Sequence, residues 1–200
     1  QSFAPATVAA TSGYVVANVV FDRPPLFLIQ PAEILQGGEF LLFALLGLCA
    51  AAVSILYMQT ILRTAKFARE LNISPPPRGL IAGVGLGLVT LWLPEITGVG
   101  QYTMRFATID GAFSAFELGG LMLGKIALTA FCLGFGFVGG VFSPALVVGA
   151  LFGGLFWTIS SVIMPDTLSS YSIYVICGMM AVTSPVIGAP LTTILIVFEL

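Results

Sequence analysis

The groups most able to do chemistry in this 200-residue chain are backbone amides of a glycine-rich turn, Gly139-Gly140-Val141-Phe142-Ser143-Pro144. Proline suits the first position of a helix, where the N–H group has no partner to lose, and serine is a favoured N-cap. We therefore expect a helix to begin at Pro144 with Ser143 as its N-cap. Its free amides and the positive end of its dipole would face the turn and could bind an anion.

The predicted anion site contains no lysine or arginine, since residues 134–155 carry no charge. A bare cation in a low dielectric would hold an anion tightly. Partial charges on amides can replace part of the anion's hydration and still release it, as conduction requires. Irregular backbone at membrane depth is tolerated where protein buries it or where it lines a wet cavity, so such a break indicates a pathway.

An alternative interpretation is that these glycines only allow helices to approach closely. Gly149 and Gly153 have the GxxxG spacing that does this, and we expect them to lie at a helix contact. Glycine spacing alone favours the packing interpretation. A second break, predicted from Ser184 to Pro190, favours the functional one, because paired helix interruptions are typical of transporter binding sites.

Composition excludes several classes of function. The chain has no histidine, and its cysteines, Cys49, Cys132 and Cys177, are far apart in apolar runs, so we expect no metal site, no disulfide and no cofactor. No arrangement of nucleophile and base suggests an enzyme or a catalytic residue. A net charge of −2 without a basic stripe does not suggest a nucleic-acid partner.

The solvent of this chain is a lipid bilayer. Hydrophobic residues make up 58% of it and charged residues 8%, and residues 40–62, 126–165 and 167–198 contain no Asp, Glu, Lys or Arg. A transmembrane helix needs only about 20 such residues. We predict an all-α, multi-span membrane bundle with tilted and broken helices, forming one domain over residues 1–200 that is a piece of a longer protein.

Glycine and proline positions divide the chain into helices, which we predict at residues 4–21, 37–71, 78–92, 118–133, 144–163, 172–182 and 191–200. Residues 95–117 suit a short or partly inserted helix. Four basic residues between Arg63 and Arg78 place the turn at 72–77 in the cytoplasm and the loop at 22–39 outside. We expect Lys125 to lie at a helix end with its amine at the membrane surface, and Arg105, Asp110 and Glu117 to form a solvated rim.

Several motifs carry a family resemblance. The GGVFSP turn resembles the GxFxP signature of the CLC family of chloride channels and chloride/proton antiporters. Residues 178–181, 188–193 and 198–200 are similar to its GMxA, RAPLT and FEL segments in order and spacing, and residues 79–100 resemble its helix that ends in LPEVLGxG. Gly188 departs from the pattern, because many members have arginine there.

The resemblance implies selective chloride translocation, with the amides of Val141 and Phe142 binding the anion. Gly139, Gly140 and Pro144 would shape the turn, and Ser143 stands at a variable position. The family has two inverted halves, so this chain would be the last helix of the first half and most of the second.

The expected partners are therefore the remaining half of the same polypeptide, a second copy in a homodimer, and a lipid bilayer, of the bacterial inner-membrane type. The family's gating and proton glutamates would lie outside these 200 residues, which leaves channel and antiporter open. Two other functions also stay open: an accessory membrane bundle without transport, and a secondary carrier of an organic anion.

Overall fold

The computed structural model describes Ser12, Val16 and residues 39–71, 73–98, 100–164 and 168–199. These ranges contain helices and no strand, which confirms the all-α prediction. The predicted helix at 4–21 and the loop at 22–38 lie outside the described residues, except for the two single residues. The elements are α2 (Glu39–Glu70), α3 (Pro75–Trp92), the 3-10 helix η2 (Pro94–Ile96), α4 (Gln101–Ala107), α5 (Ala115–Gly134), α6 (Phe142–Ile163), α7 (Tyr171–Ile187) and α8 (Pro190–Glu199).

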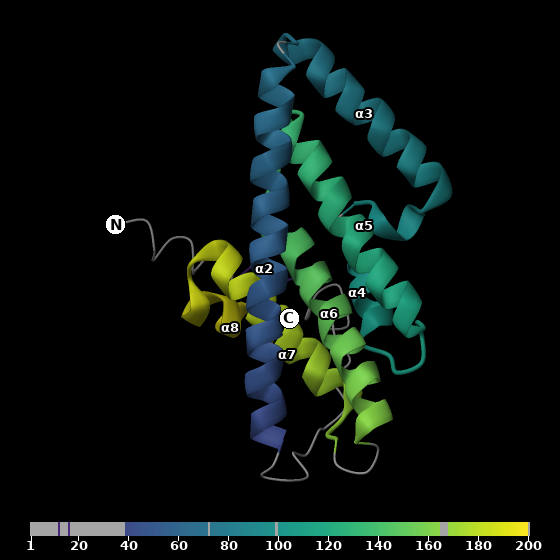
Figure 1. Cartoon of the computed structure of the whole chain (residues 1–200), viewed down its shortest axis with the longest axis vertical. Coiled ribbons are helices and arrows are strands. Elements are labelled where there is room, and N and C mark those ends of the chain that lie inside the picture. Colours follow the sequence, from purple (N-terminus) through teal and green to yellow (C-terminus); the bar gives the residue numbers. More distant parts are fainter. Residues whose placement is uncertain are drawn as a thin grey trace.

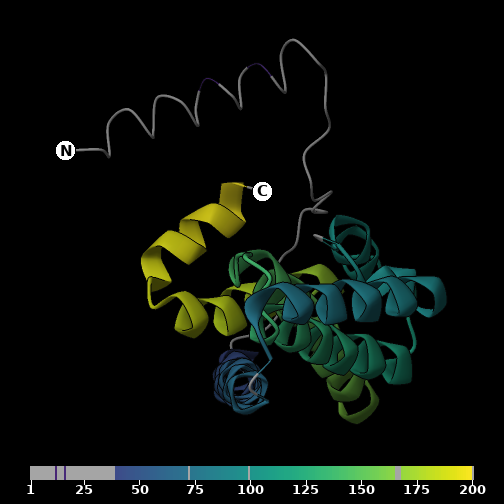
Figure 2. The same ribbon diagram turned by 90° about the horizontal axis from the view of Figure 1, so that it is seen from above.

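Helix α2 runs the full length of the molecule in Figure 1. Its 32 residues span about 48 Å, more than the roughly 30 Å hydrocarbon core, as its predicted length required. Viewed nearly along α2, α3 and α5 extend to one side of it and α8 to the other (Figure 2). Helices α2, α5 and α6 are each long and apolar enough to cross a membrane, so the chain is an integral membrane protein.

Helix α5 begins earlier than predicted because a capping box fixes its first turn. The Glu117 amide donates to the Ser114 hydroxyl, and the Glu117 carboxylate accepts from the Ser114 amide at 2.8 Å. Lys125 therefore lies in the middle of the helix and not at its end, so the prediction for this residue is wrong. The exposed Arg105, Asp110 and Glu117 agree with a solvated rim.

Helices α6 and α7 make the most extensive contact in the described chain. A Cβ added to Gly153 would lie 2.3 Å from the carbonyl oxygen of Tyr174, and one added to Gly149 would lie 2.7 Å from that of Gly178. Only glycine lets the two backbones approach this closely. The predicted packing role of the GxxxG pair is confirmed, and it holds α6 in place.

Helix α7 continues into the break predicted at 184–190 and ends inside it, at Ile187. Pro185 lies inside the helix, with its ring exposed, and costs one hydrogen bond to the preceding turn. Its C-cap is Gly188, whose φ of 71° is left-handed, and α8 begins at Pro190. The second break is therefore a two-residue corner. Position 188 favours glycine because a left-handed backbone conformation is unfavourable for residues with a side chain.

Candidate functional site

The glycine-rich turn joins α5 to α6 without regular structure. After α5 ends at Gly134, Gly136 has a φ of 104°, and Gly139 and Gly140 do not need positive φ. Helix α6 begins at Phe142 with Val141 as its N-cap.

The predicted cap is wrong by two residues, since Ser143 and Pro144 are already inside the first turn. The helix tolerates Pro144 there because first-turn N–H groups have no intrahelical acceptor. The first closing bond runs from the Ala145 amide to the Val141 carbonyl at 3.1 Å.

The beginning of α6 lies about halfway along α2 (Figure 1). A hydrogen bond fixes this depth, because the hydroxyl of Tyr57, near the middle of α2, donates to the Val141 carbonyl at 3.2 Å. To the residues that the structure describes, the amides of Val141 and Phe142 donate no hydrogen bond. The turn therefore combines a helix N-terminus, about halfway along α2, with two backbone donors available to a ligand.

A hollow of about 240 Å³ adjoins this turn. Its lining includes residues from α5 and from the turn, among them Lys125, Thr129, Cys132, Gly139, Gly140 and Pro144. A Cβ built on Gly140 meets nothing within 4 Å, so the space beside this residue is open. The hollow is large enough for a chloride ion with several waters.

Lys125 is the functional candidate that sequence reasoning placed wrongly. Only 3% of this residue is exposed, and its ammonium donates to the carbonyls of Ile96 and Gly98 at 2.8 Å each. The turn itself contains no lysine or arginine, as predicted, but Lys125 of α5 lines the hollow beside it. The carbonyls offset part of the charge, and its field still favours an anion in the hollow. The isolated position of Lys125 in an apolar helix was the available signal.

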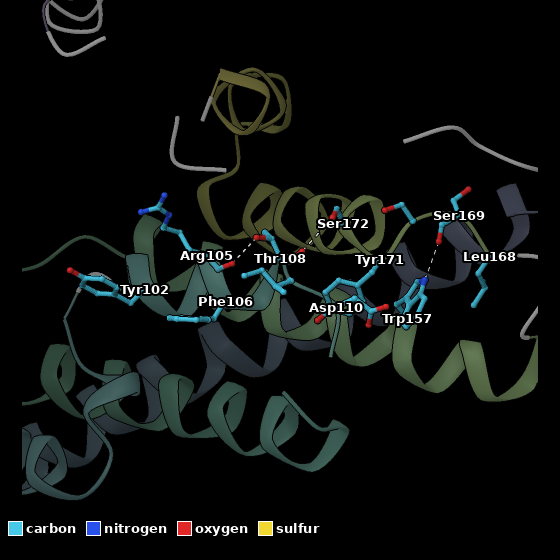
Figure 3. Close-up of a pocket in the computed structure, with 12 residues that line it drawn as sticks. Tyr102, Arg105, Phe106, Thr108, Asp110, Trp157, Leu168, Ser169, Tyr171 and Ser172 are labelled. Atoms are coloured by element: carbon cyan, nitrogen blue, oxygen red, sulfur yellow. Dashed lines mark hydrogen bonds between the residues drawn. The ribbon is translucent and has the colours of Figure 1, made fainter. Parts of the chain in front are cut away.

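A larger hollow of about 830 Å³ lies between α4 and the start of α7 (Figure 3). The Trp157 indole donates to the Ser169 carbonyl at 3.1 Å, and the Ser172 hydroxyl donates to the Thr108 carbonyl at 3.3 Å. In Figure 3 the Arg105 guanidinium points away from Asp110. These bonds join the polypeptide segments around the hollow and indicate a structural role for its polar groups.

Glu39, at the first turn of α2, is a second buried charge that the sequence did not single out. Its carboxylate accepts from the amide and hydroxyl of Ser169 and from the Tyr174 hydroxyl, the last at 3.2 Å. These donors compensate a side chain that is only 2% exposed. Because Glu39 and Tyr57 are 18 positions apart on one helix, about 27 Å separates them, so this cluster is remote from the turn.

Comparison with known proteins assigns the chain to a family. The family model described as voltage gated chloride channel matches residues 1–200. The H(+)/Cl(-) exchange transporter ClcA of Vibrio vulnificus (strain YJ016) is 32% identical over 175 residues, covering 86% of this chain and 37% of the relative. The ClcA protein of Vibrio cholerae serotype O1 (strain O395) is 29% identical over 197 residues, covering 96% and 42%.

A plant relative carries a different name. Chloride channel protein CLC-f of Arabidopsis thaliana is 25% identical over 213 residues, covering 96% of this chain and 26% of the relative. The chain thus spans less than half the length of these curated relatives. Their names describe transport and not catalysis.

Proposed function

Because the chain belongs to the voltage gated chloride channel family, we propose that it forms one part of a chloride pathway across a membrane. In this proposal the amides of Val141 and Phe142 bind the ion. The observation that carries it is the N-terminus of α6, about halfway along α2, where these two amides donate to no described residue and where the flanking residues Gly139, Gly140 and Pro144 line an open hollow.

Chloride suits this arrangement for electrostatic reasons. Two oriented amides and the positive end of a helix of 22 residues offer partial charge without a protonatable group. The Lys125 ammonium, hydrogen-bonded to two carbonyls, lines the same hollow. It makes the electrostatic potential there more positive without occupying the turn. Partial charges and a compensated lysine bind the anion weakly enough for it to leave again, as conduction requires.

The complete pathway needs more than this turn. Removing an anion from water is costly, so several hydrogen-bond donors must together replace its hydration shell. The curated relatives are more than twice as long as the matched region, so we assign the further donors and the gate to the rest of the polypeptide. The proposal extends to a homodimer in a bacterial inner membrane. Relatives named as an exchanger and as a channel leave both modes of chloride movement within it.

Chloride titration of the full-length protein by calorimetry tests the site. Gly140→Val would place a side chain in the open space beside Gly140, the residue directly before the two amides, so saturable chloride heat should disappear from a folded variant. Gly120→Val is the matched control, since an added Cβ there also meets nothing within 4 Å and Gly120 lies on α5 away from the turn. Undiminished binding by Gly140→Val would contradict the assignment.

The same titration separates the competing functions. An organic-anion carrier would show tighter binding of a small carboxylate than of chloride, and the Gly140→Val change would weaken the carboxylate. An accessory bundle would give no saturable heat with either anion. Chloride heat that only Gly140→Val removes supports the pathway.

A further inference from the structure

Tyr57 is a buried polar residue near the middle of α2. It is 0% exposed, and its hydroxyl reaches from α2 to the carbonyl oxygen of Val141, 84 positions along the chain. A buried hydroxyl needs a hydrogen-bond partner, and most such bonds only stabilise the fold. The identity of this acceptor gives Tyr57 a more specific role.

The Val141 carbonyl and the Phe142 N–H belong to one peptide group. A peptide group is planar and trans, so its C=O and N–H point in opposite directions. Anchoring the carbonyl on Tyr57 therefore fixes the direction of the Phe142 N–H. This N–H is one of the two donors that the proposed function assigns to chloride.

The anchored carbonyl also accepts from the Ala145 amide, at 3.1 Å. Hydrogen bonds that share a peptide group polarise one another, by roughly 10–30% per bond. Two donors on the oxygen of Val141 thus draw electron density from the Phe142 N–H and make it a stronger donor. The helix supplies one of the two, and Tyr57 supplies the other.

We propose that Tyr57 is a positioning residue for anion binding, which orients and polarises the Val141–Phe142 peptide from the side opposite the ion. This inference rests on the proposed function. It adds to that function a side chain on α2 that sets the strength of a backbone donor without touching the anion. In the described chain, its hydrogen bond also holds the N-terminus of α6 beside the middle of α2.

The experiment compares chloride affinity of the full-length protein with that of Tyr57→Phe, which removes only the hydroxyl. Loss of one orienting and polarising bond should raise the chloride dissociation constant roughly three- to tenfold. Tyr174→Phe is the matched control, because the Tyr174 hydroxyl is also on a fully buried residue and also donates at 3.2 Å, but to Glu39. Its chloride affinity should equal that of the unchanged protein.

A spectroscopic readout separates positioning from general stability. Labelling valine carbonyls with ¹³C and phenylalanine amides with ¹⁵N selects Val–Phe peptides, of which residues 1–200 contain three, at 20–21, 141–142 and 197–198. The Phe142→Leu variant assigns the signal of interest by removing it. In Tyr57→Phe without chloride, the Phe142 amide proton should move upfield, and its response to chloride should require a higher concentration.

The outcomes distinguish the two proposals. No response of Phe142 to chloride in the unchanged protein overturns the proposed function and with it this inference. A chloride response in which Tyr57→Phe and the unchanged protein agree overturns only the role of Tyr57, as does a loss of stability with unchanged affinity.

Should Tyr57→Phe not fold, 3-fluorotyrosine at position 57 gives a stronger donor of nearly the same shape. It should tighten chloride binding, and unchanged or weaker binding would refute the inference.

Discussion

The substitution Gly153→Ala tests the contact that positions α6, and with it the proposed site. Its added Cβ would lie 2.3 Å from the carbonyl oxygen of Tyr174 and 2.8 Å from the Cα of Val175. Ordinary contact begins near 3.4 Å, so α7 would have to withdraw by about 1 Å along a backbone that cannot rotate away. Overpacking of this kind costs about 3 kcal/mol, from which the better helix propensity of alanine subtracts about 1 kcal/mol.

Gly120→Ala provides the reference, because it gains the same propensity in α5 and its Cβ meets nothing within 4 Å. The two variants should therefore differ in free energy of unfolding by about 3 kcal/mol, with the unchanged protein between them. Unfolding of the full-length protein in mixed dodecylmaltoside and SDS micelles, followed by tryptophan fluorescence, measures this difference. Equal stability of both variants would show that the α6 and α7 backbones are farther apart than these distances. It would refute the conclusion that this contact holds α6 in place.

Other predictions address the buried charges and the orientation. Lys125→Gln should cost about 2–3 kcal/mol of unfolding free energy, since buried carbonyls lose charged donors, and should weaken chloride binding in the calorimetric titration. Glu39→Gln should destabilise by a similar ~2 kcal/mol in the micelle assay and leave chloride affinity unchanged. In a cysteine-free background, Ser74→Cys should react with an impermeant thiol reagent from the cytoplasm and Met164→Cys from outside; the reverse pattern would contradict the assigned orientation.

The existence of the long helices was predictable, because a long apolar run in the sequence identifies a membrane helix. The predicted 37–71 and 144–163 segments correspond closely to α2 and α6. Helix ends were less predictable, since proline is compatible with any first-turn position and can also sit within a helix. Pro144 and Pro185 both misplaced a boundary for this reason.

The turn that carries the candidate site was predictable, but its surroundings were not. Glycine and proline signals depend on local backbone geometry, which a short stretch of sequence expresses. The approach of Lys125 to the Gly98 carbonyl and of Tyr57 to the Val141 carbonyl depends on how distant helices pack. Periodicity gives no measure of such tertiary distances, and an isolated polar residue in an apolar run indicates only that a partner must exist.

The glycine contact between α6 and α7 also has a mechanical consequence. Backbones that touch without intervening side chains have no rotamers to absorb relative sliding, so the pair behaves as one rigid body. In the proposed chloride pathway, any conformational change would then move α6 and α7 together, with the hinges elsewhere. The left-handed corner at Gly188, where α7 gives way to α8, is one point at which the backbone can bend while the rigid pair keeps its shape.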